Sequence, residues 1–230
     1  MNVFQKMAAL FFKGLTGLMF RVDAAELTRV PRHGPLIIVT NHVHIPEIPT
    51  LYVRLLPRKV IGMAQAERVL DKNLWGAIMR WIDTIPVWRG EADLNALRTG
   101  IRVLAEGNII LLDPEGTRSH DGCLQKGQPG AILLALHSGA SILPVVHYGS
   151  ENYQKALKHL RRVDMHYVVG KPFRLDAGAE RVTSGVRQQM IDEVMFQMAS
   201  LLPFQYRGAY ADLKTTSQKY LVFEEKYSLI

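Results

Sequence analysis

The segment GPLIIVTNHVHIPE, residues 34–47, is the most informative stretch of the chain. An apolar run opened by a Gly-Pro pair predicts a short buried strand from Leu36 to Thr40. His42, His44 and Glu47 follow this strand in a proline-containing turn. The end of a buried strand can carry either catalytic groups or ordinary loop residues, so the rest of the chain has to decide between them.

Further apolar runs alternate with helical patterns along the chain. We expect strands within residues 59–64, 84–90, 108–119, 141–149 and 163–173, and helices within residues 47–56, 72–83, 92–107, 128–139 and 181–203. Such alternation predicts an α/β fold with a mostly parallel central sheet and helices on both faces. Ligand sites in these sheets lie beyond the carboxyl ends of the strands, so the functional residues should lie in the loops there.

The predicted α/β domain spans residues 31–205 and is flanked by two smaller segments. Residues 1–30 form an N-terminal segment, and residues 206–230 form a C-terminal tail. Apolar residues recur at steps of three and four in the first segment, at Phe4, Met7, Phe11, Leu15, Leu18 and Val22. The apolar run is shorter than the roughly 20 residues of a membrane-spanning helix and is interrupted by Lys13. It predicts an amphipathic membrane-docking helix, with a core helix of a soluble domain as the alternative.

The overall charge points to anionic partners. The formal net charge is +7 and the pI is about 9.6, which suit lipid head groups, phosphorylated substrates or nucleic acid. No RNP-type motif, helix-turn-helix signature or basic tract appears, so we expect no nucleic-acid partner. Cys123 is the only cysteine, which excludes a disulfide framework and a cysteine-based zinc site.

The predicted loops contain residues suited to proton transfer and phosphate binding. A carboxylate such as Glu47 can accept one imidazole N–H of His42, fix its tautomer and stabilise the imidazolium. No serine accompanies this pair, so the nucleophile would be a hydroxyl of the substrate. Arg89 and Arg118 can bind a phosphate bidentately, and Gly116 permits a positive φ or a close approach of backbone to ligand.

Four blocks of this sequence together resemble those of a known enzyme family. NHVHIPE, PVWRG, DPEGTRS and ILPVVHYG are similar, in this order, to the conserved blocks of the glycerolipid acyltransferases, the lysophosphatidic-acid acyltransferase family. The resemblance runs from Gly34 to Pro172, and the Pro-Glu-Gly-Thr-Arg block at residues 114–118 matches in full. The chain departs from the family at Glu47, where the family has aspartate.

The resemblance implies transfer of an acyl group from acyl-CoA or acyl-carrier protein to a hydroxyl of a lysophospholipid in phospholipid biosynthesis. The expected acceptor is 1-acylglycerol-3-phosphate. The implied catalytic residues are His42, as general base, and Glu47, which orients it. The implied substrate-binding residues are Arg89, Glu115, Gly116, Thr117 and Arg118.

The resemblance also implies which partners the chain has and where it works. The implied acyl-transfer reaction needs no metal and no resident cofactor, because acyl-CoA or acyl-carrier protein serves as co-substrate. The expected location is peripheral or monotopic, on the cytoplasmic face of a membrane that contains anionic lipids.

Two other functions stay open from the residues. The glutamate at position 47 leaves room for a non-catalytic or altered-specificity lipid-binding relative. A metal-dependent hydrolase could combine His42, His44 and Glu47 with His147 or His166, although the usual zinc-ligand spacings are missing.

Overall fold

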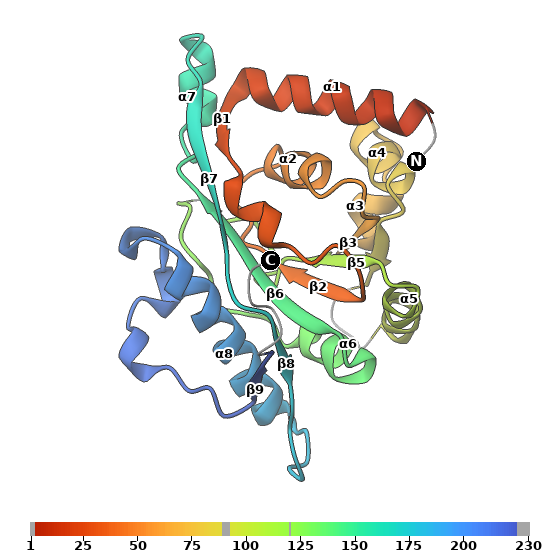
Figure 1. Cartoon of the computed structure of the whole chain (residues 1–230), viewed down its shortest axis with the longest axis vertical. Coiled ribbons are helices and arrows are strands. Elements are labelled where there is room, and N and C mark those ends of the chain that lie inside the picture. The colour runs from red at the N-terminus through yellow and green to blue at the C-terminus, as the bar shows by residue number, and fades with distance from the viewer. Residues whose placement is uncertain (1–2, 89–92, 120, 225–230) are drawn as a thin grey trace.

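The computed structural model describes residues 3–88, 93–119 and 121–224, and in this part of the chain nine strands form one sheet flanked by helices (Figure 1). The strands are β1 (Phe20–Asp23), β2 (Leu36–Val39), β3 (Val60–Gln65), β4 (Ile85–Val87), β5 (Ile109–Leu112), β6 (Ser141–Tyr148), β7 (Val163–Val169), β8 (Phe173–Leu175) and β9 (Leu221–Phe223). The α-helices are α1 (Val3–Met19), α2 (Glu47–Arg54), α3 (Ala66–Leu70), α4 (Leu74–Trp81), α5 (Leu94–Ala105), α6 (Gly130–Ser138), α7 (Tyr153–Lys158) and α8 (Ser184–Leu201). Short 3-10 helices lie at Ala25–Arg29, Phe204–Tyr206, Gly208–Tyr210 and Leu213–Thr215.

The sheet is mostly parallel, as the sequence predicts. Its strand order is β1-β7-β6-β2-β5-β3-β4, with β8 beside β6 and β9 beside β8. Strands β6, β2, β5, β3 and β4 run parallel to one another, and β1 is parallel to β7. The pairings β6–β7, β6–β8 and β8–β9 are antiparallel. The central strands therefore end at one edge of the sheet, and their loops share that edge.

Both faces of the sheet are covered, because the central strands β2 and β5 are apolar and buried at every position. In β2, Ile37 and Val39 face a core formed with α5, α6 and α8. Leu36 and Ile38 face a second core, which includes Leu51 of α2. All four β2 residues are buried, and fully burying one such side chain stabilises the fold by roughly 1.5–3 kcal/mol. The predicted arrangement of helices on both faces is confirmed.

The N-terminal helix ends earlier than its apolar spacing predicts. The pattern suggests a helix through Val22, but α1 ends at Met19 and the chain enters β1. Phe20 pairs with Val163 of β7 and is 1% exposed. The correction has a simple cause, because an apolar residue at Val22, which pairs with Met165, suits both a helical stripe and a strand.

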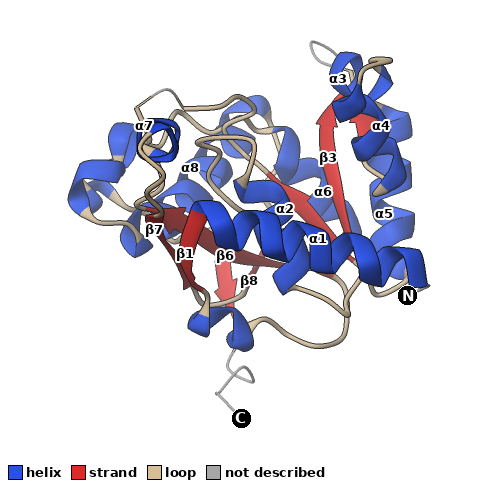
Figure 2. Ribbon diagram, turned by 90° about the horizontal axis from the view of Figure 1, so that it is seen from above, coloured by secondary structure: helices blue, strands red, loops and turns tan. Residues whose placement is uncertain are grey.

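Helix α1 lies on the outside of the molecule. It packs against α2 and lies over it in both views (Figures 1 and 2). Thr16 faces the protein and is buried, whereas most of the described side chains of α1 are partly or fully exposed. Among the residues that the structure describes, no helix combines the length and apolar character needed to cross a membrane.

Two segments near the C-terminus differ from the expected pattern. The strand predicted within residues 163–173 is divided into β7 and β8, and Pro172 lies in the break. The segment after residue 205, predicted as a C-terminal tail, contributes β9 to the sheet. Its side chains Tyr210 and Tyr220 are buried, so this part of the chain packs with the α/β core.

Candidate active site

The loops after β2, β5 and β6 meet at one edge of the sheet. Val39, the last residue of β2, lies beside Leu112, the last residue of β5, and Asn41 is bonded to His147 near the end of β6, so the chain leaves these strands in the same region. Open α/β sheets bind their ligands at this edge. The predicted site residues His42 and Glu47, and those within 115–118, all lie on or directly after the first two of these loops.

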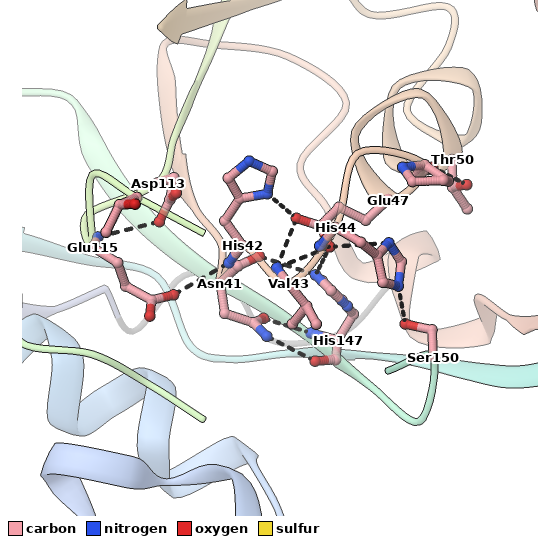
Figure 3. A network of polar contacts seen from close by, with 12 residues as sticks. Asn41, His42, Val43, His44, Glu47, Thr50, Asp113, Glu115, His147 and Ser150 are labelled. Carbon is pink, nitrogen blue, oxygen red and sulfur yellow. Dashed lines mark hydrogen bonds and ion pairs between the residues drawn. The ribbon is translucent and has the colours of Figure 1, made fainter. Parts of the chain in front are cut away.

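The structure brings His42 and Glu47 together. Helix α2 begins at Glu47, directly after Pro46, and the carboxylate turns back toward the preceding loop. Glu47 Oε1 is hydrogen-bonded to His42 Nδ1. The N–H groups of Val43 and His44 donate to the same carboxylate at 3.1 and 2.8 Å. In Figure 3 the second ring nitrogen of His42 points away from Glu47.

The electrostatics of Glu47 determine the tautomer of His42. Glu47 is 2% exposed, and burial alone would raise its pKa. The charges and hydrogen bonds of His147 and His42 outweigh burial and hold the pKa of Glu47 well below its usual range. An ionised carboxylate only accepts hydrogen bonds, so His42 Nδ1 carries a proton and Nε2 is left with a lone pair when the ring is neutral. The His42 side chain keeps 19% exposure, so a substrate hydroxyl can reach it.

Asn41 and His147 join the end of β2 to the end of β6. The Asn41 side-chain amide donates to the His147 carbonyl at 2.9 Å, and the His147 N–H donates to Asn41 Oδ1 at 2.9 Å. His147 Nε2 lies 3.2 Å from Glu47 Oε2 (Figure 3). Sequence reasoning considered His147 only as a metal ligand. Its role beside Glu47 could have been predicted from its position near the end of β6, because β6 is the strand next to β2.

Glu115 supports the backbone of His42. The His42 N–H donates to Glu115 Oε1 at 3.2 Å, and the Gln125 N–H donates to Glu115 Oε2 at 2.7 Å. The Ser119 N–H donates to the His42 carbonyl at 2.8 Å, which fastens the two loops a second time. Glu115 is 2% exposed, and burial raises its pKa to about 7. Both carboxyl oxygens of this predicted substrate-binding residue are thus engaged with backbone groups.

The other predicted phosphate-binding residues lie on the same loop or outside the described residues. Gly116 adopts a φ of 69°, the positive value that the sequence suggested. Thr117 is exposed and Arg118 is half-buried. Arg89 lies outside the described residues. Of the predicted set, the structure brings Glu47 and Glu115 into contact with His42, and Gly116, Thr117 and Arg118 follow Glu115 on the same loop.

His44 lies inside the protein. It follows β2 in the turn before Glu47, and it is 7% exposed. Its Nε2 lies 2.8 Å from Ser150 Oγ, and its ring packs between Phe20 and Tyr153. Burial lowers its pKa despite the nearby Glu47. His44 is therefore a neutral packing residue beside the His42–Glu47 pair.

Histidines surround Glu47 without forming a recognisable metal site. His42, His44 and His147 all approach its carboxylate. In the part of the chain that the structure describes, no group of three or more His, Cys, Asp and Glu side chains is arranged to hold a metal ion. The contacts instead describe a hydrogen-bonded cluster with an ionised glutamate at its centre.

Known proteins resemble this chain over the same region. A family model described as "Acyltransferase" matches residues 21–148. A 1-acyl-sn-glycerol-3-phosphate acyltransferase from Bacillus subtilis is 28% identical over 169 residues, which cover 73% of this chain and 81% of that protein. A protein of the same name from Pseudomonas aeruginosa is 26% identical over 200 residues, which cover 86% and 76%.

A solved structure has the same fold. The crystal structure of the 1-acyl-sn-glycerophosphate (LPA) acyltransferase from Thermotoga maritima aligns with a TM-score of 0.60 and 20% identity. The alignment covers 85% of this chain and 77% of that one. The region matched by the family model runs from β1 to β6 and contains the His42–Glu47 pair and the 113–119 loop.

Proposed function

This chain belongs to the acyltransferase family, and we propose that it transfers a fatty acyl group from an acyl thioester to the free hydroxyl of 1-acylglycerol-3-phosphate. The family match covers more than half of the 230 residues. The printed names of the relatives support the choice of acceptor. The donor is acyl-CoA or acyl-carrier protein, and the product enters phospholipid biosynthesis.

One observation carries this proposal, the pairing of His42 with a buried, ionised Glu47 at the carboxyl ends of the strands. His42 Nε2 takes the proton of the acceptor hydroxyl while the hydroxyl oxygen attacks the carbonyl carbon of the thioester. The carbon–sulfur bond then breaks, and the leaving thiolate takes the proton back from the imidazolium. Glu47 stabilises this imidazolium, and no acyl-enzyme intermediate is required.

The 113–119 loop supplies the groups we assign to the acceptor phosphate. The N–H groups of Glu115 and Gly116 are bonded to Asp113, and that of Ser119 is bonded to His42. Exposed Thr117 and half-buried Arg118 follow Gly116 on this loop, between Glu115 and Ser119, whose contacts join the loop to His42. We assign Thr117 and the Arg118 guanidinium to the phosphate, together with Arg89, because arginine matches its oxygens bidentately.

The test is acyl transfer by the purified protein, followed by mass spectrometry of the lipid products. We expect phosphatidic acid from lysophosphatidic acid with either acyl-CoA or acyl-carrier protein, and comparing these two donors identifies the natural one. The His42→Ala variant should lose about 10²–10⁴-fold in kcat. His137→Ala is the matched control, because His137 is exposed on α6.

Two outcomes of this test would change the proposal. A wild-type protein that transfers acyl groups only to another lysolipid would have an altered head-group specificity. A protein that binds lipid but transfers no acyl group, across a panel of donors and acceptors, would be the non-catalytic relative that Glu47 leaves open.

We propose that α1 docks the enzyme on a membrane surface. Its outer side exposes large apolar side chains by 42–70% each, at Met7, Leu10, Phe11, Leu15 and Leu18. Steps of three and four place these residues on one face of the helix. An apolar patch of this kind usually marks an interaction surface. Inserting it at the head-group boundary would stabilise binding by on the order of 5 kcal/mol.

Basic side chains beside α1 suit an anionic lipid surface. Lys155, Lys158, Arg161 and Arg162 are exposed on α7 and the turn that follows it. Arg162 donates to the Gly17 carbonyl at 3.1 Å, which places this basic turn next to α1. Each lysine or arginine near an anionic membrane contributes about 1 kcal/mol. This charge supports peripheral binding to the cytoplasmic face, where anionic lipids are concentrated.

Vesicle co-sedimentation tests the docking surface. We expect tighter binding to phosphatidylcholine mixed with phosphatidylglycerol than to phosphatidylcholine alone, and no binding to duplex DNA. The double variant Leu10→Asn/Phe11→Asn should lose most of the binding. Phe204→Asn, which changes an exposed aromatic residue elsewhere, should keep it. Equal binding by both variants would refute docking through α1.

A further inference from the structure

The carboxylate of Glu47 has two oxygens with different partners. Oε1 is hydrogen-bonded to His42, the proposed base. Oε2 accepts the His44 N–H at 2.8 Å and lies 3.2 Å from His147 Nε2. His147 belongs to β6, a hundred residues along the chain from Glu47, and is 1% exposed. This buried histidine has no part in the proton transfer described above.

The contacts of His147 fix its ring as a donor to Glu47. Its Nε2 lies 2.9 Å from the Asn41 carbonyl oxygen and 3.2 Å from Glu47 Oε2. Both partners are acceptors, so Nε2 carries a hydrogen shared between them. The His147 backbone is held by the two hydrogen bonds to the Asn41 side chain. The ring therefore has little freedom to turn away from Glu47.

A glutamate at position 47 needs such a second anchor more than an aspartate would. The extra methylene adds a rotatable bond, and its freedom must be lost each time the carboxylate is held against His42. A donor fixed by the sheet holds Oε2 and thereby limits the positions open to Oε1. In Figure 3 His147 and His42 approach Glu47 from different directions.

We propose that His147 is a positioning residue for acyl transfer, which holds the second oxygen of Glu47 so that the first stays on Nδ1 of His42. Asn41 supports this role, because its side chain holds the backbone of His147 in place. This inference rests on the proposed function, because the activity it affects is acyl transfer. The orientation of Glu47 and His42, however, does not depend on which substrate the protein uses.

The charges around His147 are consistent with this role. Burial alone would lower its pKa, but Glu47 outweighs burial and raises it, with a further contribution from Glu151. The other titratable rings beside it are His44, whose pKa burial lowers, and Tyr167, whose pKa burial raises well above its usual value. His147 is therefore the ring on this side of Glu47 that donates a hydrogen to its buried carboxylate.

A double-mutant cycle tests the proposal. His147→Ala should lower kcat by about 10- to 100-fold, as expected for one hydrogen bond to a charged group, with little change in KM for the donor. His147→Gln can still donate to Glu47 and should recover most of that loss. In a Glu47→Gln background, His147→Ala should have almost no further effect, because the two residues act through one contact. His137→Gln, an exposed histidine on α6, should match wild type.

The pH profile separates positioning from a purely structural role. In His147→Ala the donor to Glu47 Oε2 is gone, so the negative charge of Glu47 beside His42 is less well compensated. The acid limb of the kcat/KM profile should then move to higher pH. Full activity of folded His147→Ala, an equal loss in both Glu47 backgrounds, or an unmoved acid limb would each overturn the proposal.

Nitrogen NMR of the imidazole rings distinguishes failure of this inference from failure of the proposed function. The His42 ring signals should change in His147→Ala, which removes the donor to Glu47, and stay unchanged in His137→Ala, whether or not the protein transfers acyl groups. Unchanged His42 signals in His147→Ala would overturn the positioning role alone. An inactive wild type in which these signals do respond would overturn the acyl-transfer proposal and keep the positioning role.

Discussion

Replacing Glu47 by aspartate, the residue that the resembling family has at this position, should weaken the enzyme. The substitution shortens the side chain by one methylene, about 1.5 Å. Glu47 Oε2 lies 3.2 Å from His147 Nε2, and the same carboxylate is bonded to His42 and to two backbone N–H groups. A carboxylate withdrawn by about 1.5 Å cannot keep both histidines within hydrogen-bonding distance.

The magnitude follows from the contact that is lost. A hydrogen bond to a charged group contributes about 1.5–3 kcal/mol, so its loss lowers the rate by roughly 10- to 150-fold. Glu47→Asp should therefore reduce kcat by about 10-fold or more, because one histidine loses its partner. Glu47→Gln, which also removes the charge, should lose about 10²–10⁴-fold.

Steady-state kinetics with acyl-CoA and lysophosphatidic acid measure both variants, and thermal unfolding confirms that each is folded. The KM for lysophosphatidic acid should change little, because Glu47 does not contact the acceptor in this account. A folded Glu47→Asp variant with the wild-type kcat would refute the reasoning. It would mean that the carboxylate reaches His42 without its second anchor.

Two further predictions concern stability. Burial raises the pKa of Glu115 from 4.5 to about 7, so between these pH values the native state holds a proton that the unfolded chain has lost. The free energy of unfolding should therefore decrease by up to about 3 kcal/mol as the pH rises through this range. Glu115→Gln should remove this pH dependence in thermal unfolding measured between pH 4.5 and 8. Asp93 caps α5 by accepting hydrogen bonds from the N–H groups of Asn95 and Ala96, and it also accepts one from the N–H of Trp88. Asp93→Ala should therefore lower the free energy of unfolding in urea by about 1–2 kcal/mol. An unchanged value would contradict the capping role.

The sequence predicts those parts of the fold that depend on local pattern. Short apolar runs alternating with helical spacing indicate a mostly parallel sheet, and a glutamate five residues after His42 is close enough to return to it across one turn. Val22 shows the limit of this reasoning. Its helical spacing continues that of α1, but pairing with Met165 of β7, which lies far along the chain, draws it into a strand.

The parts of the site that depend on distant pairing could not be predicted in the same way. His147 reaches Glu47 because β6 lies beside β2, a contact over more than a hundred residues. Glu115 was predicted to bind substrate, yet its oxygens accept the N–H groups of His42 and Gln125. Residue spacing predicts neither contact, because each depends on which strands are neighbours in the sheet.

We propose that His42, held by Glu47, removes the proton from the hydroxyl of a lysophospholipid during acyl transfer. This role is tested by comparing phosphatidic acid formed from acyl-CoA and lysophosphatidic acid by the wild type and by folded His42→Ala. We expect rapid formation by the wild type and a loss of about 10²–10⁴-fold in the variant. Equal rates of product formation by the two proteins would show that His42 is not the base.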